Sequence, residues 1–150
     1  MHPTAAKVQE RLRARGLEVD VSVLPDSTRT AAEAAAACGC DVGQIAKSLV
    51  FVREADGEVV MVLCAGDRRV ASDRLGLRPA TADEARAATG FAIGGVPPLG
   101  HDRELETIAD ESLRRFRTVW CAAGTPHAVF SVDTEALLAA LPGAHVVDVA

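Results

Sequence analysis

Residues 47–65 read KSLVFVREADGEVVMVLCA. Two apolar, β-branched runs, Lys47–Arg53 and Glu58–Ala65, lie on either side of the dipeptide Asp56-Gly57. Asp-Gly between such runs is typical of a β-hairpin, because glycine readily adopts the positive φ that a tight turn needs. The segment therefore predicts two paired antiparallel strands.

Patterns typical of helices and further strands surround this hairpin. Capping boxes at Thr30-Ala-Ala-Glu33 and Thr81-Ala-Asp-Glu84 predict two short helices that end near Gly39 and Gly90. Apolar periodicity predicts further helices over residues 5–15 and 134–141, and strands over residues 18–24, 118–122, 128–132 and 145–149. The irregular alternation of strands and helices favours an α/β (α+β) fold, with a mixed β-sheet flanked by helices, over a doubly wound parallel sheet.

Composition narrows the class of protein. A chain of 150 residues, 49% hydrophobic and 25% charged, fits a single globular domain over residues 1–150. Its longest apolar run, Val59–Ala65, is far shorter than the roughly 18 residues of a membrane span. The first residues, MHPT, do not begin a secretory leader, so a cytoplasmic protein is expected. A net charge of −5 argues against a general polyanion binder, and 3% aromatic residues argue against a base-stacking platform.

The four cysteines do not follow a metal-site spacing. Cys38 and Cys40 are separated by one residue, and no second Cys or His pair completes a four-ligand set with them. We expect them, with Cys64 and Cys121, to be reduced and mostly buried, and we expect no metal. A thiol redox pair formed by Cys38 and Cys40 is one alternative function.

Lys47 occupies an unusual place in the predicted hairpin. Strand alternation puts it on the same face as Leu49 and Phe51, whereas Ser48 shares the other face with Val50. Burying a lysine is costly unless it is paired, so a lysine on an apolar face at the start of a core strand usually has a partner or a ligand. The alternative is that the side chain extends past the strand end into water.

Two further segments could contribute to a site. The loop Gly94–Gly100, GGVPPLG, exposes backbone amides that could hold an ester carbonyl or its oxyanion, although it could also be only a rigid turn. His127 follows Gly124-Thr125-Pro126 and could act as an acid or base, or simply be exposed. Asp110 precedes Glu111-Ser112, a sequence typical of a helix N-cap.

Four short stretches of the sequence, in this order along the chain, resemble motifs of one known family. They are QIAKSLV at residues 44–50, ATGFAIGGVPPLG at residues 88–100, TIAD at residues 107–110 and WCAAG at residues 120–124. The chain is similar through nearly its whole length to the YbaK/ProX family of trans-editing aminoacyl-tRNA deacylases. These proteins are related to the editing domain inserted in bacterial prolyl-tRNA synthetases.

The resemblance implies a compact α/β fold with a partly barrel-like sheet and a pocket for the 3′ end of a charged tRNA. It also implies hydrolysis of the ester of a mischarged tRNA, helped by the ribose hydroxyl of the substrate, with no metal or organic cofactor. By the same resemblance Lys47 is the essential residue, and Gly94 and Gly95 hold the carbonyl through backbone amides. The residues it implies for substrate binding are Ser48, Pro97, Asp110, Gly124 and His127.

One difference between this sequence and the family pattern concerns the amino acid that is removed. The family members most like YbaK carry a Gly/Arg-rich stretch where this chain has Gly124-Thr125-Pro126-His127. The histidine is more like the alanine-editing branch, so the resemblance favours alanine or serine on tRNA(Pro) over cysteine. Possible partners are the tRNA acceptor end and prolyl-tRNA synthetase. The alternative function is a non-catalytic module that binds the tRNA end or a synthetase.

The net charge also bears on how such a protein would meet tRNA. At −5 it should bind tRNA weakly unless basic side chains gather near the pocket. Arg68, Arg69 and Lys47 are the side chains that could form such a basic mouth, whereas Arg114, Arg115 and Arg117 are expected on a solvated face.

Overall fold

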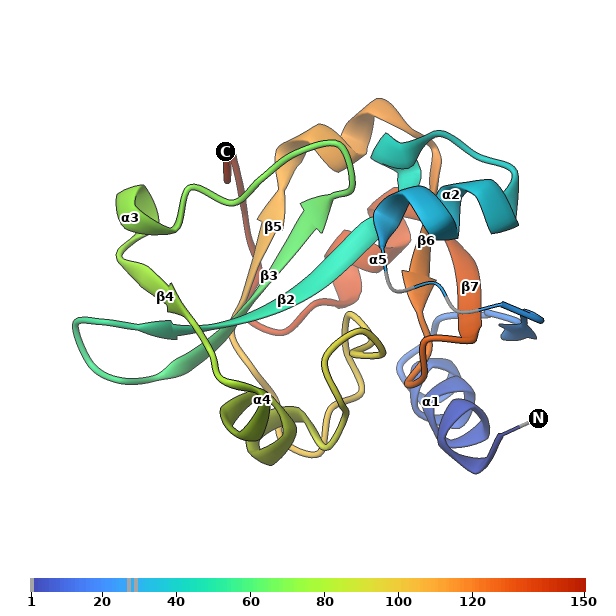
Figure 1. Ribbon diagram of the computed structural model, residues 1–150, viewed down its shortest axis with the longest axis horizontal. Helices are drawn as coiled ribbons and strands as arrows, with labels where there is room; N and C mark the ends of the chain where they lie inside the picture. Colours follow the sequence, from blue (N-terminus) through green and yellow to red (C-terminus); the bar gives the residue numbers. More distant parts are fainter. Residues whose placement is uncertain (1, 27, 29) are drawn as a thin grey trace.

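A computed structural model describes residues 2–26, 28 and 30–150 and contains two β-sheets flanked by helices (Figure 1). The five-stranded sheet has the order β4-β2-β3-β5-β8, and the three-stranded sheet has the order β1-β7-β6. The strands are β1 (Ser22–Val23), β2 (Ala46–Arg53), β3 (Val59–Ala65), β4 (Leu77–Pro79), β5 (Thr107–Asp110), β6 (Thr118–Ala122), β7 (Ala128–Asp133) and β8 (His145–Val147). The helices are α1 (Pro3–Ala14), α2 (Ala31–Cys38), α3 (Ser72–Leu75), α4 (Ala82–Thr89) and α5 (Thr134–Ala140), with 3-10 turns η1 (Val42–Gln44) and η2 (Glu111–Arg115).

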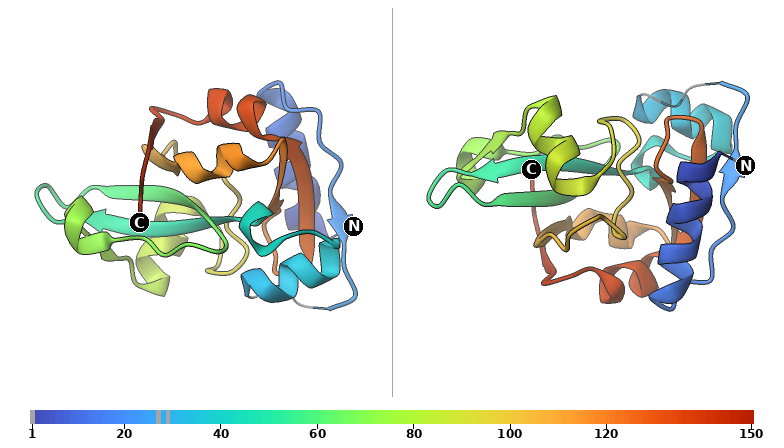
Figure 2. Two further views of the ribbon diagram at one scale, coloured as in Figure 1. Left: turned by 90° about the horizontal axis from the view of Figure 1, so that it is seen from above. Right: turned by 90° about the horizontal axis from the view of Figure 1, so that it is seen from below.

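The hairpin and the mixed sheet that the sequence predicts are confirmed. β2 and β3 pair antiparallel, with Lys47 opposite Cys64 and Val52 opposite Val59. β3 pairs parallel with β5, and β5 pairs parallel with β8. In Figures 1 and 2 the turn of this hairpin projects at one end of the molecule, and its other end leads toward the second sheet.

The second sheet refines the expected architecture. An isolated parallel bridge between Ile45 and Trp120 is where the start of β2 meets β6. Within the described residues the strands divide into two sheets and do not close into a barrel. The partly barrel-like sheet is therefore two sheets that meet at the beginning of β2.

Both capping boxes form as predicted, and each of their helices ends at a left-handed glycine. Thr30 accepts a hydrogen bond from Glu33 N–H, and Thr81 accepts one from Glu84 N–H. Gly39 and Gly90 have φ values of 67° and 84°. The helices predicted over residues 5–15 and 134–141 also form, as α1 and α5.

The strand predicted over residues 18–24 is wrong in length, because only Ser22–Val23 pairs with another strand. Val19 and Val21 alternate into the core as expected, with 2% and 9% of their surface exposed. The backbone of this segment bonds locally and to α1 instead of to a sheet: Val19 N–H donates to Leu17 O, and Val21 N–H donates to the Gln9 side chain.

The last strand also ends earlier than predicted, at Val147, while Val149 is buried in the same core cluster as Phe51 of β2. The short elements α3 and β4 carry no clear periodicity and were not predicted.

The core lies on both sides of the central hairpin. One cluster joins β3 to α1, β7 and α5 through Leu12, Leu63, Phe130 and Leu137, all fully buried. Figures 1 and 2 show α1 beside β7, where its apolar face closes this cluster. A second cluster on the opposite face of the hairpin includes Phe51. Alternating residues of β2 and β3 thus reach two different cores, which fixes the register of the hairpin.

The side chain of Asp110 is fully buried and connects the end of β3 to the residues that follow β5. Its carboxylate accepts hydrogen bonds from Ala65 N–H at 3.1 Å, at the end of β3, and from Ser112 N–H at 2.9 Å. The predicted N-cap is confirmed, and the element that it opens is the 3-10 turn η2.

The loop Gly94–Gly100 forms neither helix nor strand, as predicted, and two contacts fix it. Gly124 N–H donates to Gly95 O at 2.8 Å, and a Cβ added at Gly95 would lie only 2.7 Å from Gly124 O. His101, which is buried, places Nε2 2.7 Å from Pro97 O. The glycine at position 95 is therefore required by the close approach of two backbones.

Asp110→Ala is predicted to lower the free energy of unfolding by roughly 3–5 kcal/mol, because it leaves the buried amide of Ala65 and the half-buried amide of Ser112 without their acceptor and removes one of the two carboxylates that pair with Arg68. Asp133→Ala is the matched control, since Asp133 is an exposed N-cap that accepts from Ala136 N–H. Its loss should cost about 1 kcal/mol. Urea unfolding of both variants tests this, and equal losses would contradict a special role for the buried carboxylate.

Stability is predicted to fall as the pH drops from 7 toward 5, in part through His101. Burial lowers the pKa of this ring below its ordinary value, against the opposing effect of its hydrogen bond to Pro97. The unfolded chain then takes up a proton on this ring near pH 6.5 that the folded protein resists, so acid favours unfolding. Thermal melts at pH 7 and pH 5 should show a larger loss in melting temperature for the wild type than for His101→Gln. An equal loss in both would exclude His101 as a source.

Candidate active site

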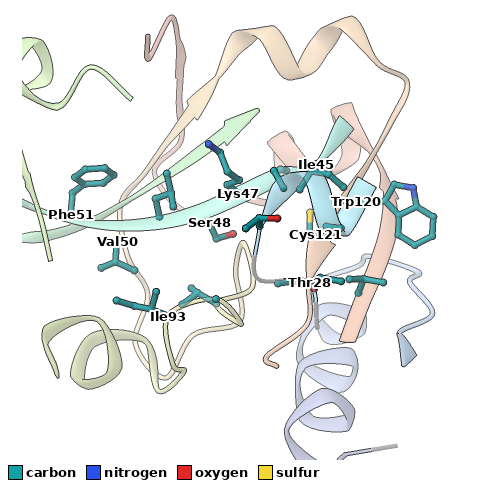
Figure 3. A pocket seen from close by; sticks show the side chains of 18 of the residues that line it. Thr28, Ile45, Lys47, Ser48, Val50, Phe51, Ile93, Trp120 and Cys121 are labelled. Carbon is teal, nitrogen blue, oxygen red and sulfur yellow. The ribbon is translucent and has the colours of Figure 1, made fainter. Parts of the chain in front are cut away.

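A pocket of about 330 Å³ opens where the two sheets meet. Its walls come from most of β2, from α2, from the start of the glycine loop with Ile93 before it, and from β6 (Figure 3). Three residues predicted for the site, Lys47, Ser48 and Gly94, line this pocket together.

The side chain of Lys47 is half-buried and has a partner, as expected from its place on an apolar face. Its Nζ donates a hydrogen bond to the main-chain carbonyl of Arg68 at 2.9 Å. Cys64, the residue opposite on β3, places its Sγ 3.6 Å from the same carbonyl. Burial raises the pKa of the Cys64 thiol to about 11, against the lowering effect of Lys47, so this neighbour is neutral at pH 7. The ammonium is therefore fixed by one neutral acceptor and keeps further N–H groups for a ligand.

Ser48 points to the other side of β2 from Lys47, toward the side on which Ile93 lies in Figure 3. Its Oγ is buried, and it has no hydrogen-bond partner among the described residues. The pocket threonines differ: Thr28 Oγ1 donates to Pro126 O, and Thr30 Oγ1 accepts from Glu33 N–H. A buried hydroxyl without a partner is unfavourable unless a ligand or water completes it.

The two glycines of the loop are not equivalent. Gly95 N–H donates to Ala92 O at 3.0 Å, so it is not free to hold a substrate carbonyl. Gly94 lines the pocket with φ of 95°, and its N–H has no acceptor among residues 2–26, 28 and 30–150. Of the two glycine amides, the open one is therefore that of Gly94, and Gly95 supports the loop through its contact with Gly124.

The other predicted residues lie outside the pocket lining. Pro97 is buried and accepts from His101, and Gly124 packs beneath Gly95. Asp110 is buried at the end of β5, beyond β3 from the pocket strand β2. His127 is exposed, and its main-chain carbonyl accepts a hydrogen bond from Leu24 N–H at 2.7 Å.

Sequence reasoning missed the apolar walls of the pocket. Ile93 lines it while 60% of its surface is exposed, and Trp120 lines it from β6 beside Ile45. Trp120 is the only tryptophan of the chain, and Ile93 is a large apolar residue directly before a Gly-Gly pair. Both signals were available, but an apolar wall residue cannot be told from a core residue by pattern alone.

Several arginines that could have supplied free positive charge are paired with carboxylates. Arg115 forms a bidentate pair with Asp67 at 2.8 and 2.9 Å, and Arg114 pairs with Glu135. Arg68 pairs with Asp110 and Asp148 and does not line the pocket, so its charge is largely neutralised and adds little to the expected basic mouth. The remaining member of that proposed set, Arg69, is exposed.

The cysteines give little support to a redox pair. Burial raises the pKa of Cys38 to about 11, with a further increase from Cys40, and it also raises the pKa of Cys40. Reactive thiol pairs have lowered pKa values instead. Within the described part of the chain, no group of three or more His, Cys, Asp or Glu residues is placed to hold a metal ion. No described helix combines the length and apolar character needed to cross a membrane.

Comparison with known proteins agrees with these features. The aminoacyl-tRNA editing domain family matches residues 25–140. The uncharacterized protein YwhH of Bacillus subtilis (strain 168) is 32% identical over 126 residues, which is 80% of each chain. The proline–tRNA ligase of Lactobacillus gasseri is 36% identical over 78 residues, which make up 47% of this chain but only 14% of the ligase.

A solved structure extends the similarity to the whole fold. The crystal structure of a candidate trans-editing enzyme for prolyl-tRNA synthetase superposes with a TM-score of 0.88 at 48% identity, covering 99% of this chain and 97% of the other. The resemblance that the sequence motifs indicate is thus confirmed over the hairpin, the glycine loop and the later strands. This chain belongs to the aminoacyl-tRNA editing domain family.

Proposed function

We propose that this protein is a trans-acting aminoacyl-tRNA deacylase. The observation that carries the proposal is the pocket that Lys47, Ser48 and Gly94 line between apolar walls. The Ser48 hydroxyl and the Gly94 amide have no partner among the described residues, and the Lys47 ammonium keeps N–H groups beyond its bond to Arg68 O. A pocket that is mostly apolar with a few convergent polar groups is typical of a small-molecule or chain-end site. Membership of the aminoacyl-tRNA editing domain family supports hydrolysis of an aminoacyl ester as the chemistry of this pocket.

The proposed reaction is hydrolysis of the ester between an amino acid and the terminal ribose. Water attacks the carbonyl carbon, the bond to the ribose oxygen breaks, and the proton of the water goes to that oxygen. The products are a free amino acid and an uncharged tRNA. The substrate's neighbouring ribose hydroxyl assists the water, so the protein supplies orientation and electrostatic stabilisation.

Each pocket group has a role in this proposal. The Lys47 ammonium positions the ester or the terminal phosphate, and the Gly94 N–H donates to the carbonyl oxygen as negative charge develops there. The Ser48 hydroxyl, which has no partner among the described residues, forms a hydrogen bond with the substrate. Gly95, Pro97 and Gly124 hold the loop in place, and no step uses a metal or an organic cofactor.

The proposed substrate is tRNA(Pro) carrying alanine or serine, with cysteine as a weaker candidate. The similarity to part of a proline–tRNA ligase and to a candidate trans-editing enzyme for prolyl-tRNA synthetase supports tRNA(Pro) and that synthetase as partners. His127 favours a small amino acid by its resemblance to the alanine-editing branch. Size exclusion separates neighbouring amino acids by only about 10–200-fold per methylene, so a panel is needed. The proposed activity belongs in the cytoplasm, where charged tRNA is made.

Lys47→Ala is predicted to lower kcat/KM for deacylation of Ala- or Ser-tRNA(Pro) by about a hundredfold or more, since it removes a preorganised charge. Lys7→Ala is the matched control, because Lys7 is the only other lysine and lies exposed on α1. The measurement is the release of amino acid from Ala-, Ser-, Cys- and Pro-tRNA(Pro) by wild type and both variants.

If the wild type and Lys7→Ala hydrolyse one mischarged ester selectively and Lys47→Ala does not, the result would support the proposal and name the substrate. If the folded wild type releases none of the four amino acids, deacylation of these substrates is excluded. Binding of the same tRNAs without turnover would then indicate the alternative function, a non-catalytic module.

Ser48→Ala is predicted to reduce kcat/KM about tenfold, the effect of one lost hydrogen bond. The free energy of unfolding should stay the same or rise, because the variant removes a buried hydroxyl that lacks a partner in the protein. Ser131→Ala is the control, since Ser131 is an exposed serine on β7. Activity assays and urea unfolding, run together, test this. A clear loss of stability in Ser48→Ala would mean that its hydroxyl has a structural partner instead.

A further inference from the structure

The segment Gly66–Arg68, which follows β3, packs closely against the residues that lead into β2. Gly66 N–H donates to Ile45 O at 2.7 Å. A Cβ added at Gly66 would lie 2.3 Å from Val42 O, so only glycine fits there. The backbone of this segment therefore lies directly beside the strand that carries Lys47.

The position of the Lys47 ammonium depends on this segment, because its protein acceptor is Arg68 O at 2.9 Å. A lysine side chain has a flexible four-carbon stem, and its ammonium is placed only by what it binds. The contacts that fix the main chain at Arg68 therefore determine the position of the Lys47 ammonium.

The Arg68 N–H donates to Ala65 O at 3.0 Å, and the Arg68 side chain adds a second hold by bridging two carboxylates. Its Nη2 lies 2.7 Å from Asp148 Oδ1, and its Nε lies 3.5 Å from Asp110 Oδ2, an ion pair without a well-directed hydrogen bond. Asp110 is itself fixed by Ala65 N–H and Ser112 N–H in a fully buried position. The guanidinium therefore ties its own backbone to the end of β5 and to the residues after β8.

From these contacts we infer that Arg68 is a positioning residue for Lys47. The chain of contacts runs from Asp110 and Asp148 through the guanidinium to the Arg68 carbonyl and then to the ammonium. This inference rests on the proposed deacylation for its effect on rate, but its effect on the lysine exists in the protein alone. A displacement of a catalytic group by about 1 Å can lower a rate about a hundredfold.

Loss of the Arg68 side chain should leave the rest of this region in place. Arg115 holds the neighbouring Asp67 by two hydrogen bonds. Arg74 holds the final residues through Asp148 O at 2.8 Å and Ala150 O at 2.9 Å. Arg74→Ala is therefore a matched control: it removes an arginine bound to the same terminal segment but not to Asp110 or to the acceptor of Lys47.

The kinetic test compares Arg68→Ala, Arg68→Lys and Arg74→Ala with the wild type. Arg68→Ala should lower kcat for deacylation about ten- to a hundredfold with KM changed less than about twofold. Arg68→Lys, which retains a cation between the two carboxylates, should recover part of the loss, and Arg74→Ala should stay within about twofold of the wild type. Equal losses in Arg68→Ala and Arg74→Ala, or an effect on KM alone, would overturn the inference.

A second test needs no activity. Because the chain has only two lysines, ¹³C-labelled lysine gives two sets of ε-methylene NMR signals, those of Lys47 and those of Lys7, whose Nζ lies 5.5 Å from the centre of the Phe91 ring. In the wild type and Arg74→Ala the Lys47 signals should be those of an immobilised side chain, with two distinct ε-proton shifts. In Arg68→Ala the two ε-proton shifts of Lys47 should merge into one averaged shift.

The two tests separate the inference from the proposed function. A wild type that deacylates none of the tRNAs but shows the NMR change would remove the proposed function while keeping Arg68 as the residue that positions Lys47. Lys47 signals unchanged in Arg68→Ala would overturn the inference whatever the activity.

Discussion

The pairing of β2 with β3 is the constraint on which the rest of the site depends. With Lys47 opposite Cys64, the lysine falls on the side of the strand where Arg68 O accepts from it. The same register turns Ser48 to the opposite side, where its hydroxyl is buried without a partner. A shift by one residue would exchange these two side chains and turn the apolar residues that alternate with them toward the opposite core. Two cores, one on each face of the hairpin, make that shift costly and so hold both polar groups in place.

Much of this arrangement could be predicted because it follows from local chemistry. The Asp-Gly turn, the two capping boxes and the N-cap at Asp110 depend on residues within a few positions of one another. The same holds for the placement of Lys47 and Ser48 on opposite faces, which needs only strand alternation. The family motifs then indicated that the first strand of the hairpin and the glycine loop belong to one site, and the structure brings Lys47, Ser48 and Gly94 to one pocket.

What could not be predicted depends on contacts between distant segments. Residues 18–21 alternate like a strand, but their backbone bonds locally and to the Gln9 side chain. The two loop glycines look alike in sequence, yet the Gly95 amide is taken by Ala92 O and the Gly94 amide is open. The acceptor of Lys47 is a main-chain carbonyl twenty-one positions away, and no residue type marks such an acceptor. Pattern reasoning finds the groups that carry chemistry more readily than the backbone atoms that orient them.

The charges of the protein limit how it could meet a tRNA. Several of its arginines, among them Arg53, Arg68, Arg78 and Arg115, are paired with carboxylates, and the net charge is −5. Affinity for nucleic acid rises with the number of phosphates that unpaired cations neutralise, because each releases counterions. A surface with few unpaired cations therefore gains little binding affinity from contact with the phosphates in the body of a tRNA. Under the proposed function, recognition would therefore depend on the acceptor end inside the pocket, with the choice of tRNA supplied by a partner such as the synthetase that holds it.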